Sequence, residues 1–407
     1  MRISTNQLYD RSIQNILNNQ GDLADIQQQL ATGKKLLRPS DDPVGASKVI
    51  RLTEELEQLE QFQRNNNFLT SALEEQEAVM RNINDAVLRA RQLAIQSGSG
   101  AVAPEDRLAI SVEIAEIRDQ VFDAMNTRNA AGDYIFAGYQ SQSPAFVYDP
   151  AATGNKYQFQ GDEGVNNIQL SPSVRVQSTD SGKTVFEDVL ARLTSTITGG
   201  SAADSALKIT PQSDFDRFHQ QNYDAVTPAN NQFQIQINGA GTQATITNTG
   251  TGANLGTVNF TSEEPFTFNG MQFTIEGGPG DTVNFQLDAP QKKNLAQTLD
   301  DFFHALSDPS LTGEAFTRKL DDALIGIDNG MNKLGAATAG VGGRLNVAQS
   351  IFESNLDLEI AAKSTRSDIE DVDYAKAVSD LSRQETALQA AQATFGRVTG
   401  LSLFDYI

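Results

Sequence analysis

The residues that could perform chemistry in this sequence are few and poorly placed for it. The chain has two histidines, His219 and His304, and no cysteine. Neither histidine belongs to an HExxH motif or has a second histidine at helical spacing. Zinc sites are built from such clusters, so we interpret both histidines as structural or solvated residues.

Carboxylate pairs and one glycine-rich stretch are the other candidates. Among 52 acidic residues, pairs arise by chance, and we read Asp41/Asp42 as helix caps and Glu263/Glu264 and Asp300/Asp301 as surface residues. The stretch GAATAGVGGR, residues 335–344, lacks GxxxxGK[ST] and a preceding strand, so it favours a flexible hinge over a nucleotide loop. The sequence therefore predicts no enzyme and no catalytic, cofactor-binding or metal-binding residue.

Composition narrows the classes of partner. A net charge of -21 argues against nucleic acid and anionic membrane surfaces, because phosphate binders need a basic face. No run of about 18 apolar residues is present, so no membrane insertion is expected. The first residues lack the apolar core of a secretory signal. At 407 residues, the chain is expected to form two or three domains.

Both ends of the chain are predicted to be narrow-faced helices. Apolar residues recur at alternating spacings of three and four, with Gln20, Gln27, Glu385 and Gln392 at the remaining positions. These apolar residues are Ile13, Ile16, Leu23 and Leu30 at the N-terminus, and Tyr374, Val378, Leu381, Leu388 and Phe395 at the C-terminus. So thin a seam does not stabilise a helix alone. Two readings stay open: assembly elements that neighbouring subunits complete, or members of one intramolecular bundle.

A helical bundle is predicted next to these ends. Gly33 can end the first helix, and a joint formed by Arg38, Pro39, Ser40, Asp41 and Asp42 leads to a helix that begins near Pro43. Apolar ladders predict helices to about residue 97, from 104 to about 129, and again from 294 onward, with Gln76 as the one polar position in its ladder. In the last long helix we expect a joint near 365–368.

The middle of the chain has the period-two pattern of strands. Alternating apolar residues between about 230 and 290 are joined by turns such as Asn238-Gly239, and a short helix is expected at 185–197. The predicted fold is α+β and multidomain, an elongated rod with paired terminal helices, a helical bundle of discontinuous segments and a β-rich insert. The expected domains are a terminal coiled-coil-like domain (1–42 and 365–407), a helical bundle (43–139 and 291–364) and an outer β domain (140–290).

Two terminal motifs resemble those of the flagellin family. LATGKKLLRPSDDPVGA, residues 30–46, is similar to the N-terminal signature of flagellins and their relatives, and SDIEDVDYAKAVSDLSRQETALQAA, residues 367–391, to the C-terminal one. GDYIFAGYQSQSPAF, 132–146, and LSLFDYI, 401–407, are similar to the members that join the hook to the filament. The likeness covers about 1–150 and 290–407, whereas 150–290 matches only as a β-rich insert.

This resemblance implies a structural protein of the bacterial flagellum. Such a protein is secreted unfolded through the flagellar type III export apparatus and acts in motility at the hook–filament junction. The implied partners are hook-associated protein 1, flagellin, further copies of the chain in a ring, and an export chaperone. The apolar residues of the terminal helices would make the inner contacts, and residues 38–42 would form the joint between layers.

Three alternatives to the junction role are carried forward. The first is a true flagellin that polymerises into filaments. The second is a flagellin-like protein with a hydrolase in its insert, against which the missing HExxH argues. The third is an adhesive or receptor-binding module at 140–290.

Overall fold

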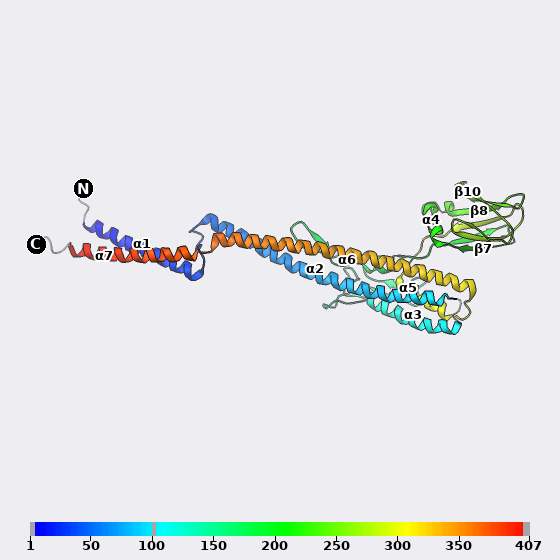
Figure 1. The fold of residues 1–407 in the computed structure, drawn as a ribbon, viewed down its shortest axis with the longest axis horizontal. Helices are drawn as coiled ribbons and strands as arrows, with labels where there is room; N and C mark the ends of the chain where they lie inside the picture. Colours follow the sequence, from blue (N-terminus) through cyan, green and yellow to red (C-terminus); the bar gives the residue numbers. More distant parts are fainter. Residues whose placement is uncertain (1–4, 100–102, 402–407) are drawn as a thin grey trace. The chain divides into compact units, whose positions relative to one another are not determined.

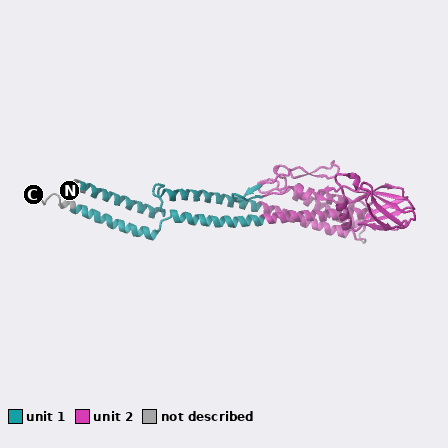
Figure 2. Cartoon of the chain, turned by 90° about the horizontal axis from the view of Figure 1, so that it is seen from above, with its two compact units in different colours: residues 1–71, 167–176, 345–407 teal, residues 72–166, 177–344 magenta. Residues whose placement is uncertain are grey.

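The computed structural model describes residues 5–99 and 103–401. Unit 1 comprises 1–71, 167–176 and 345–407, and unit 2 comprises 72–166 and 177–344 (Figure 2). The helices and antiparallel sheets of these units confirm the predicted α+β class. Of the motif LSLFDYI, residues 402–407 lie outside the described part of the chain.

Long α-helices form both ends of the chain (Figure 1). Pro43 and Pro104 stand at the first positions of their helices, where the missing N–H of proline is not needed. The helices are α1 (Thr5–Thr32), α2 (Pro43–Ser97), α3 (Pro104–Met125), α4 (Gln212–Asn222), α5 (Leu295–Ser307), α6 (Gly313–Glu370) and α7 (Tyr374–Leu401).

Three local predictions were wrong. The glycine-rich stretch 335–343 is not a break, because α6 continues through it with Leu334, Val341 and Ala348 buried on one side. The joint expected at 365–368 lies later, between the end of α6 and the start of α7. The segment 185–197 is not a helix: a short π-helical turn at Lys183–Glu187 precedes strands, while the amphipathic α4 was missed.

The helices of unit 2 pack around a dense apolar interior. The predicted ladders of α2 and α3 are buried, including Met80, Val87, Ile114 and Val121. A Cβ added at Gly326 would lie 2.7 Å from Thr298 Cγ2, so α5 and α6 pack too closely there for a larger residue. None of the described helices is long and apolar enough to cross a membrane.

The β-rich insert is built of antiparallel sheets. A five-stranded sheet has the order β10-β9-β8-β13-β6, and a three-stranded sheet the order β11-β12-β7. Their strands are β6 (Ser195–Gly200), β7 (Asp204–Ile209), β8 (Gln232–Ile237), β9 (Gln243–Asn248), β10 (Asn254–Asn259), β11 (Phe266–Phe268), β12 (Met271–Glu276) and β13 (Thr282–Leu287). The alternating pattern that predicted β8 to β13 is confirmed.

Three shorter pairings each join two strands. These are β1 (Phe146–Tyr148) with β2 (Tyr157–Phe159), β3 (Asn167–Gln169) with β4 (Arg175–Gln177), and β5 (Val189–Leu190) with β14 (Lys292–Lys293). A short 3₁₀ turn, Pro228–Asn231, precedes β8. The β5–β14 ribbon marks where the chain enters the insert and where it returns to the helices.

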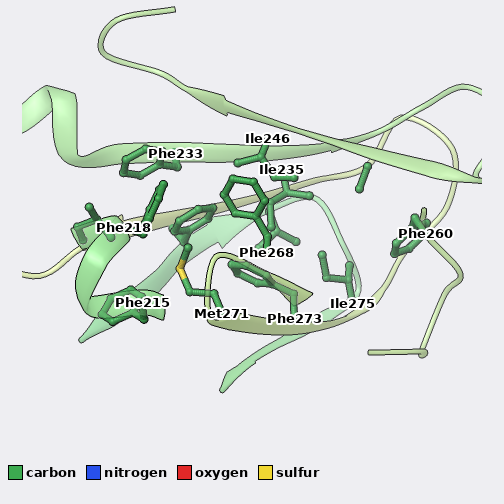
Figure 3. Close-up of a cluster of buried hydrophobic side chains, with 14 of the residues drawn as sticks. Phe215, Phe218, Phe233, Ile235, Ile246, Phe260, Phe268, Met271, Phe273 and Ile275 are labelled. Atoms are coloured by element: carbon green, nitrogen blue, oxygen red, sulfur yellow. The ribbon is translucent and has the colours of Figure 1, made fainter. Parts of the chain in front are cut away.

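Phenylalanine dominates the core of the insert (Figure 3). Phe233 stacks on Phe285 with ring centroids 5.2 Å apart, and Phe273 lies 5.1 Å from Phe285. From the missed helix α4, Phe215 and Phe218 enter the same cluster. Period-two burial on the two sheets therefore gives the insert an apolar core of its own.

In unit 1, side-chain amides fasten the β3–β4 hairpin to two helices. Asn65 of α2 donates to the Gln169 carbonyl at 2.8 Å, and Asn355 of α6 donates to the Leu170 carbonyl at 2.8 Å. Nearby, hydrogen bonds from Lys363 and Gln63 lower the pKa of Glu359 below its ordinary value. The hydrogen bonds from Asn65 and Asn355 are directional, so they fix the position of the hairpin along both helices.

Truncating the centre of the phenylalanine cluster should destabilise the insert. We expect Phe285→Ala to lower its free energy of unfolding by about 3–5 kcal/mol, because a fully buried ring leaves a cavity. Denaturant unfolding followed by tyrosine fluorescence would measure it. Val226→Ala is the control, since Val226 is 89% exposed and should change little. Equal effects of the two substitutions would contradict the assignment of this core.

Candidate assembly interface

The two ends of the chain form an antiparallel helix pair in unit 1 (Figures 1 and 2). Near one end of the pair, the Tyr9 and Phe395 rings meet edge to face with centroids 6.0 Å apart. In the middle, Gln384 Nε2 donates to Asp22 Oδ2 at 3.0 Å. At the other end, a backbone bridge joins Lys34 to Asp371. The order of these contacts defines the antiparallel register of α1 and α7.

Six of the nine apolar residues predicted for the interface are partly buried in this pair. They are Ile16, Leu23, Leu30, Leu381, Leu388 and Phe395. Ala377 is fully packed and was not predicted, and Ile26 is a further partly buried residue that the ladder missed. The structure thus brings these six residues into one chain's own pair of helices. The part of them that stays exposed remains available to other chains.

The other three predicted residues are solvent-exposed. Ile13, Tyr374 and Val378 have exposed fractions of 45%, 57% and 55%, and Leu17, which was not predicted, reaches 54%. The residues of the two predicted ladders therefore divide into a seam between α1 and α7 and a set of exposed apolar side chains.

The seam is too thin to form a core. Among the side chains that the structure describes in α1 and α7, only Ala377 is buried. Each helix spans 28 residues, and partial burial of a few leucines and isoleucines offsets little of the entropy lost on ordering both. The pair is therefore marginal alone and gains stability wherever another surface covers it.

The predicted joint is a capped turn. Arg38 N donates to Asp41 Oδ2 at 2.9 Å, and Asp41 N donates to the Arg38 carbonyl at 3.0 Å. The carboxylate of Asp42 accepts from Gly45 N at 2.9 Å and so caps the start of α2, as predicted. Pro39 and Ser40 are exposed in the same turn.

A second set of contacts at the joint was not predicted. Lys35 N donates to the Glu370 carbonyl at 2.7 Å, and Val372 N donates to the Gly33 carbonyl at 2.9 Å. An ion pair between Lys34 and Glu370 reinforces this tie. Only backbone groups and one ion pair form it, so no apolar pattern signals it. Residues 33–35 and 370–372 thus join the break between α1 and α2 to the break between α6 and α7.

The histidines and the Asp300 carboxylate, considered above as candidates for chemistry, differ in burial and contacts. His219 is buried, with Nε2 2.8 Å from the Asp288 carbonyl, and His304 is largely exposed. The surface reading of Asp300 was wrong: it is buried between α3 and α5 and bonded to Arg118 at 2.8 Å. Burial is the largest cause that raises the pKa of neighbouring Tyr157 above its ordinary value. The described residues include no group of three or more acidic or histidine side chains able to hold a metal.

The GDYIFAGY motif folds into a tightly packed loop of unit 2. Its residues 134–137 are buried, and the Phe136 ring lies 4.9 Å from that of Phe186. Gly138 has φ +71°, and a Cβ there would lie 2.3 Å from the Asp162 carbonyl oxygen. Tyr139 N donates to Asp162 Oδ1 at 2.9 Å. The positive φ and the close contact with the Asp162 backbone therefore require glycine at position 138 of the motif.

Comparisons with known proteins agree with these features. The model of the bacterial flagellin N-terminal helical region matches residues 3–141. Flagellar hook-associated protein 3 of Escherichia coli (strain K12) is 24% identical over 409 residues, covering 100% of this chain and 99% of that protein. Over its whole length the chain is similar to hook-associated protein 3, and its N-terminal third matches the flagellin N-terminal region. The resemblance predicted from the sequence is confirmed.

Two further matches differ in how much of the chain they cover. The crystal structure of the flagellar junction protein of Legionella pneumophila has a TM-score of 0.56 at 20% identity, covering 79% of this chain and 100% of that chain. The flagellin of Listeria monocytogenes is 26% identical over 132 residues, which is 32% of this chain and 46% of that flagellin. The likeness to hook-associated protein 3 thus extends over the insert, whereas this flagellin matches only in part.

Glycine at position 33 should be necessary for the tie. A side chain there would combine a φ of +71° with a Cβ 3.1 Å from the Tyr374 hydroxyl oxygen. We expect Gly33→Ala to destabilise the α1–α7 pair by about 1 kcal/mol or more. The matched control Gly21→Ala has open space around its Cβ within a helix and should stabilise the pair by about 0.5–1 kcal/mol. Hydrogen exchange of α1 would report both, and equal shifts in the same direction would refute the role of Gly33.

Proposed function

We propose that this chain is a structural component of the bacterial flagellum that joins the hook to the flagellin filament. Similarity to hook-associated protein 3 over the whole chain is the observation that carries the proposal. A flagellin would be expected to match most strongly at its ends, where the helices are shared. The packed GDYIFAGY loop adds support, because it lies in 132–146, the stretch that resembles the members joining the hook to the filament.

In this proposal, α1 and α7 are assembly elements. The six seam residues hold the two helices of one chain together, and Ile13, Tyr374 and Val378 face neighbouring subunits in the axial structure. The half-buried seam supports this role, because a marginal pair orders fully only when copies cover one another. Residues 38–42, with the tie at 33–35 and 370–372, act as the joint between the terminal helices and the helical bundle.

The proposed partners follow from the position at the junction. Hook-associated protein 1 lies on the hook side, flagellin on the filament side, and further copies of the chain complete a ring. A type III export chaperone would hold the terminal helices before secretion. Their exposed apolar residues and thin seam give such a chaperone a surface to cover. The proposed domains are 1–42 with 365–407, 43–139 with 291–364, and 140–290.

Electron microscopy of the purified chain distinguishes a junction protein from a flagellin. The protein would be incubated under filament-forming salt conditions, alone and with isolated hooks that carry hook-associated protein 1. We expect short additions at hook ends that then accept flagellin. Long filaments grown without hooks would identify a flagellin and contradict the junction role.

The seam can be tested with one substitution. We expect Leu388→Ala to be secreted normally but to fail to carry a filament, because loss of a half-buried leucine costs the thin pair about 1–2 kcal/mol. Motility and export assays would measure this. Leu108→Ala is the control, since it truncates a leucine that is 55% exposed on α3, outside the terminal pair. Normal swimming of the Leu388→Ala strain would count against the assembly role of the seam.

A further inference from the structure

The side chains of Gln76 and Arg344 both contact the carboxylate of Asp180 in unit 2. Gln76 is the polar position in the apolar ladder of α2, and Arg344 follows the glycine-rich stretch of α6. Gln76 Nε2 donates to Asp180 Oδ2 at 2.8 Å, and Arg344 Nη2 also contacts Asp180 Oδ2. From β4, Gln177 Nε2 donates to Asp180 Oδ1 at 3.0 Å. Asp180 therefore ties a loop to both long helices.

Burial makes this junction sensitive to the loss of any member. Gln76 is 1% exposed, and the side chains of Arg344 and Asp180 are 17% and 21% exposed. A charge pair so shielded from water is strongly disrupted when one partner is removed, because the remaining charge has lost its compensation. Asp180 both compensates the charge of Arg344 and accepts a hydrogen bond from the amide of Gln76.

The segment of α6 just before Arg344 is intrinsically weak. Gly335, Gly340, Gly342 and Gly343 lie within a continuous helix, where glycine is the least favourable residue after proline. None of these four glycines is required by close packing, because a Cβ built on each meets no described atom within 4 Å. The segment 335–343 therefore pays the entropic cost of glycine with no packing benefit from the described residues.

We propose that Asp180 is a latch on this soft segment of α6. While the carboxylate holds Arg344 and Gln76, residues 335–343 stay helical. When the carboxylate loses its bonds to Arg344 and Gln76, this segment unfolds before the rest of the helix. The inference concerns the fold of unit 2 and does not depend on the proposed function.

Three buried polar atoms around Asp180 have no hydrogen-bond partner among the described residues, which favours opening of the latch. Gln76 Oε1, Thr179 Oγ1 and Arg344 Nε are buried, and none has a hydrogen-bond partner among the described residues. Opening exposes all three to bulk water, which can bond to each of them. These new hydrogen bonds to water lower the free energy of opening, which favours opening at this point of the helix.

Hydrogen exchange of the full chain, read by mass spectrometry, tests the latch. In Asp180→Ala we expect the amides of 339–347, whose helical acceptors are the carbonyls of the glycine segment 335–343, to exchange about ten-fold faster or more. Peptides of α3 and α5 should keep their rates. Asp214→Ala is the matched control, since it removes a carboxylate in a half-exposed ion pair with Arg217 in the insert. It should leave 339–347 unchanged.

A second variant keeps the proposal testable if Asp180→Ala does not fold. Alanine at Gly335, Gly340 and Gly342 together should slow exchange of 339–347 several-fold and, combined with Asp180→Ala, restore protection. Unchanged exchange of 339–347 in Asp180→Ala would overturn the latch. So would an equal acceleration along the whole chain, or triple-alanine exchange identical to that of the parent chain.

Discussion

The backbone tie between the two terminal segments is the constraint that sets where the two long helical paths must meet. Gly33 to Lys35 and Glu370 to Val372 bond through their backbones, so the chain between them forms a closed loop. Closing a loop of this length costs little more entropy than closing a much shorter one, because the cost grows only with the logarithm of its length. The middle of the chain can therefore hold a whole β domain without disturbing the ends. Pairing of α1 with α7 requires only that the start of α2 and the end of α6 lie close together.

Stability is distributed unevenly between the elements that this loop connects. In unit 2, the residues of α5 from Leu295 to Asp300 are all buried, and the insert has its own phenylalanine core. In the terminal pair, Ala377 alone among the described side chains is buried. Elements with dense cores fold on their own account, whereas the thin pair depends on what covers it. Polar contacts such as those of Asn65 and Asp180 add positional specificity where apolar packing allows sliding.

The sequence predicts those parts of the fold that rest on periodic burial. Met80, Ile114 and the alternating residues of β8 to β13 lie in long, regular patterns, and the structure places them in cores. The backbone tie at Lys35 and Glu370 leaves no such pattern, because any residue supplies its hydrogen bonds. The glycines of 335–343 do not interrupt α6, because helix propensity is a weak preference that neighbouring buried residues such as Val341 override. Asp300 looked like surface because its partner Arg118 lies far away in sequence.

The division of the predicted interface follows from helix geometry. A strict seven-residue repeat drifts by about 20° per heptad on a straight α-helix. Tyr374, Leu381, Leu388 and Phe395 are each seven residues apart, so the four cannot all keep one angular position on a straight helix. Tyr374, at the first position of α7, is 57% exposed. The same drift that weakens the pair within one chain leaves apolar side chains outside it. A supercoil or a neighbouring surface would be needed to bury the whole repeat, and this need supports an assembly role for the terminal helices.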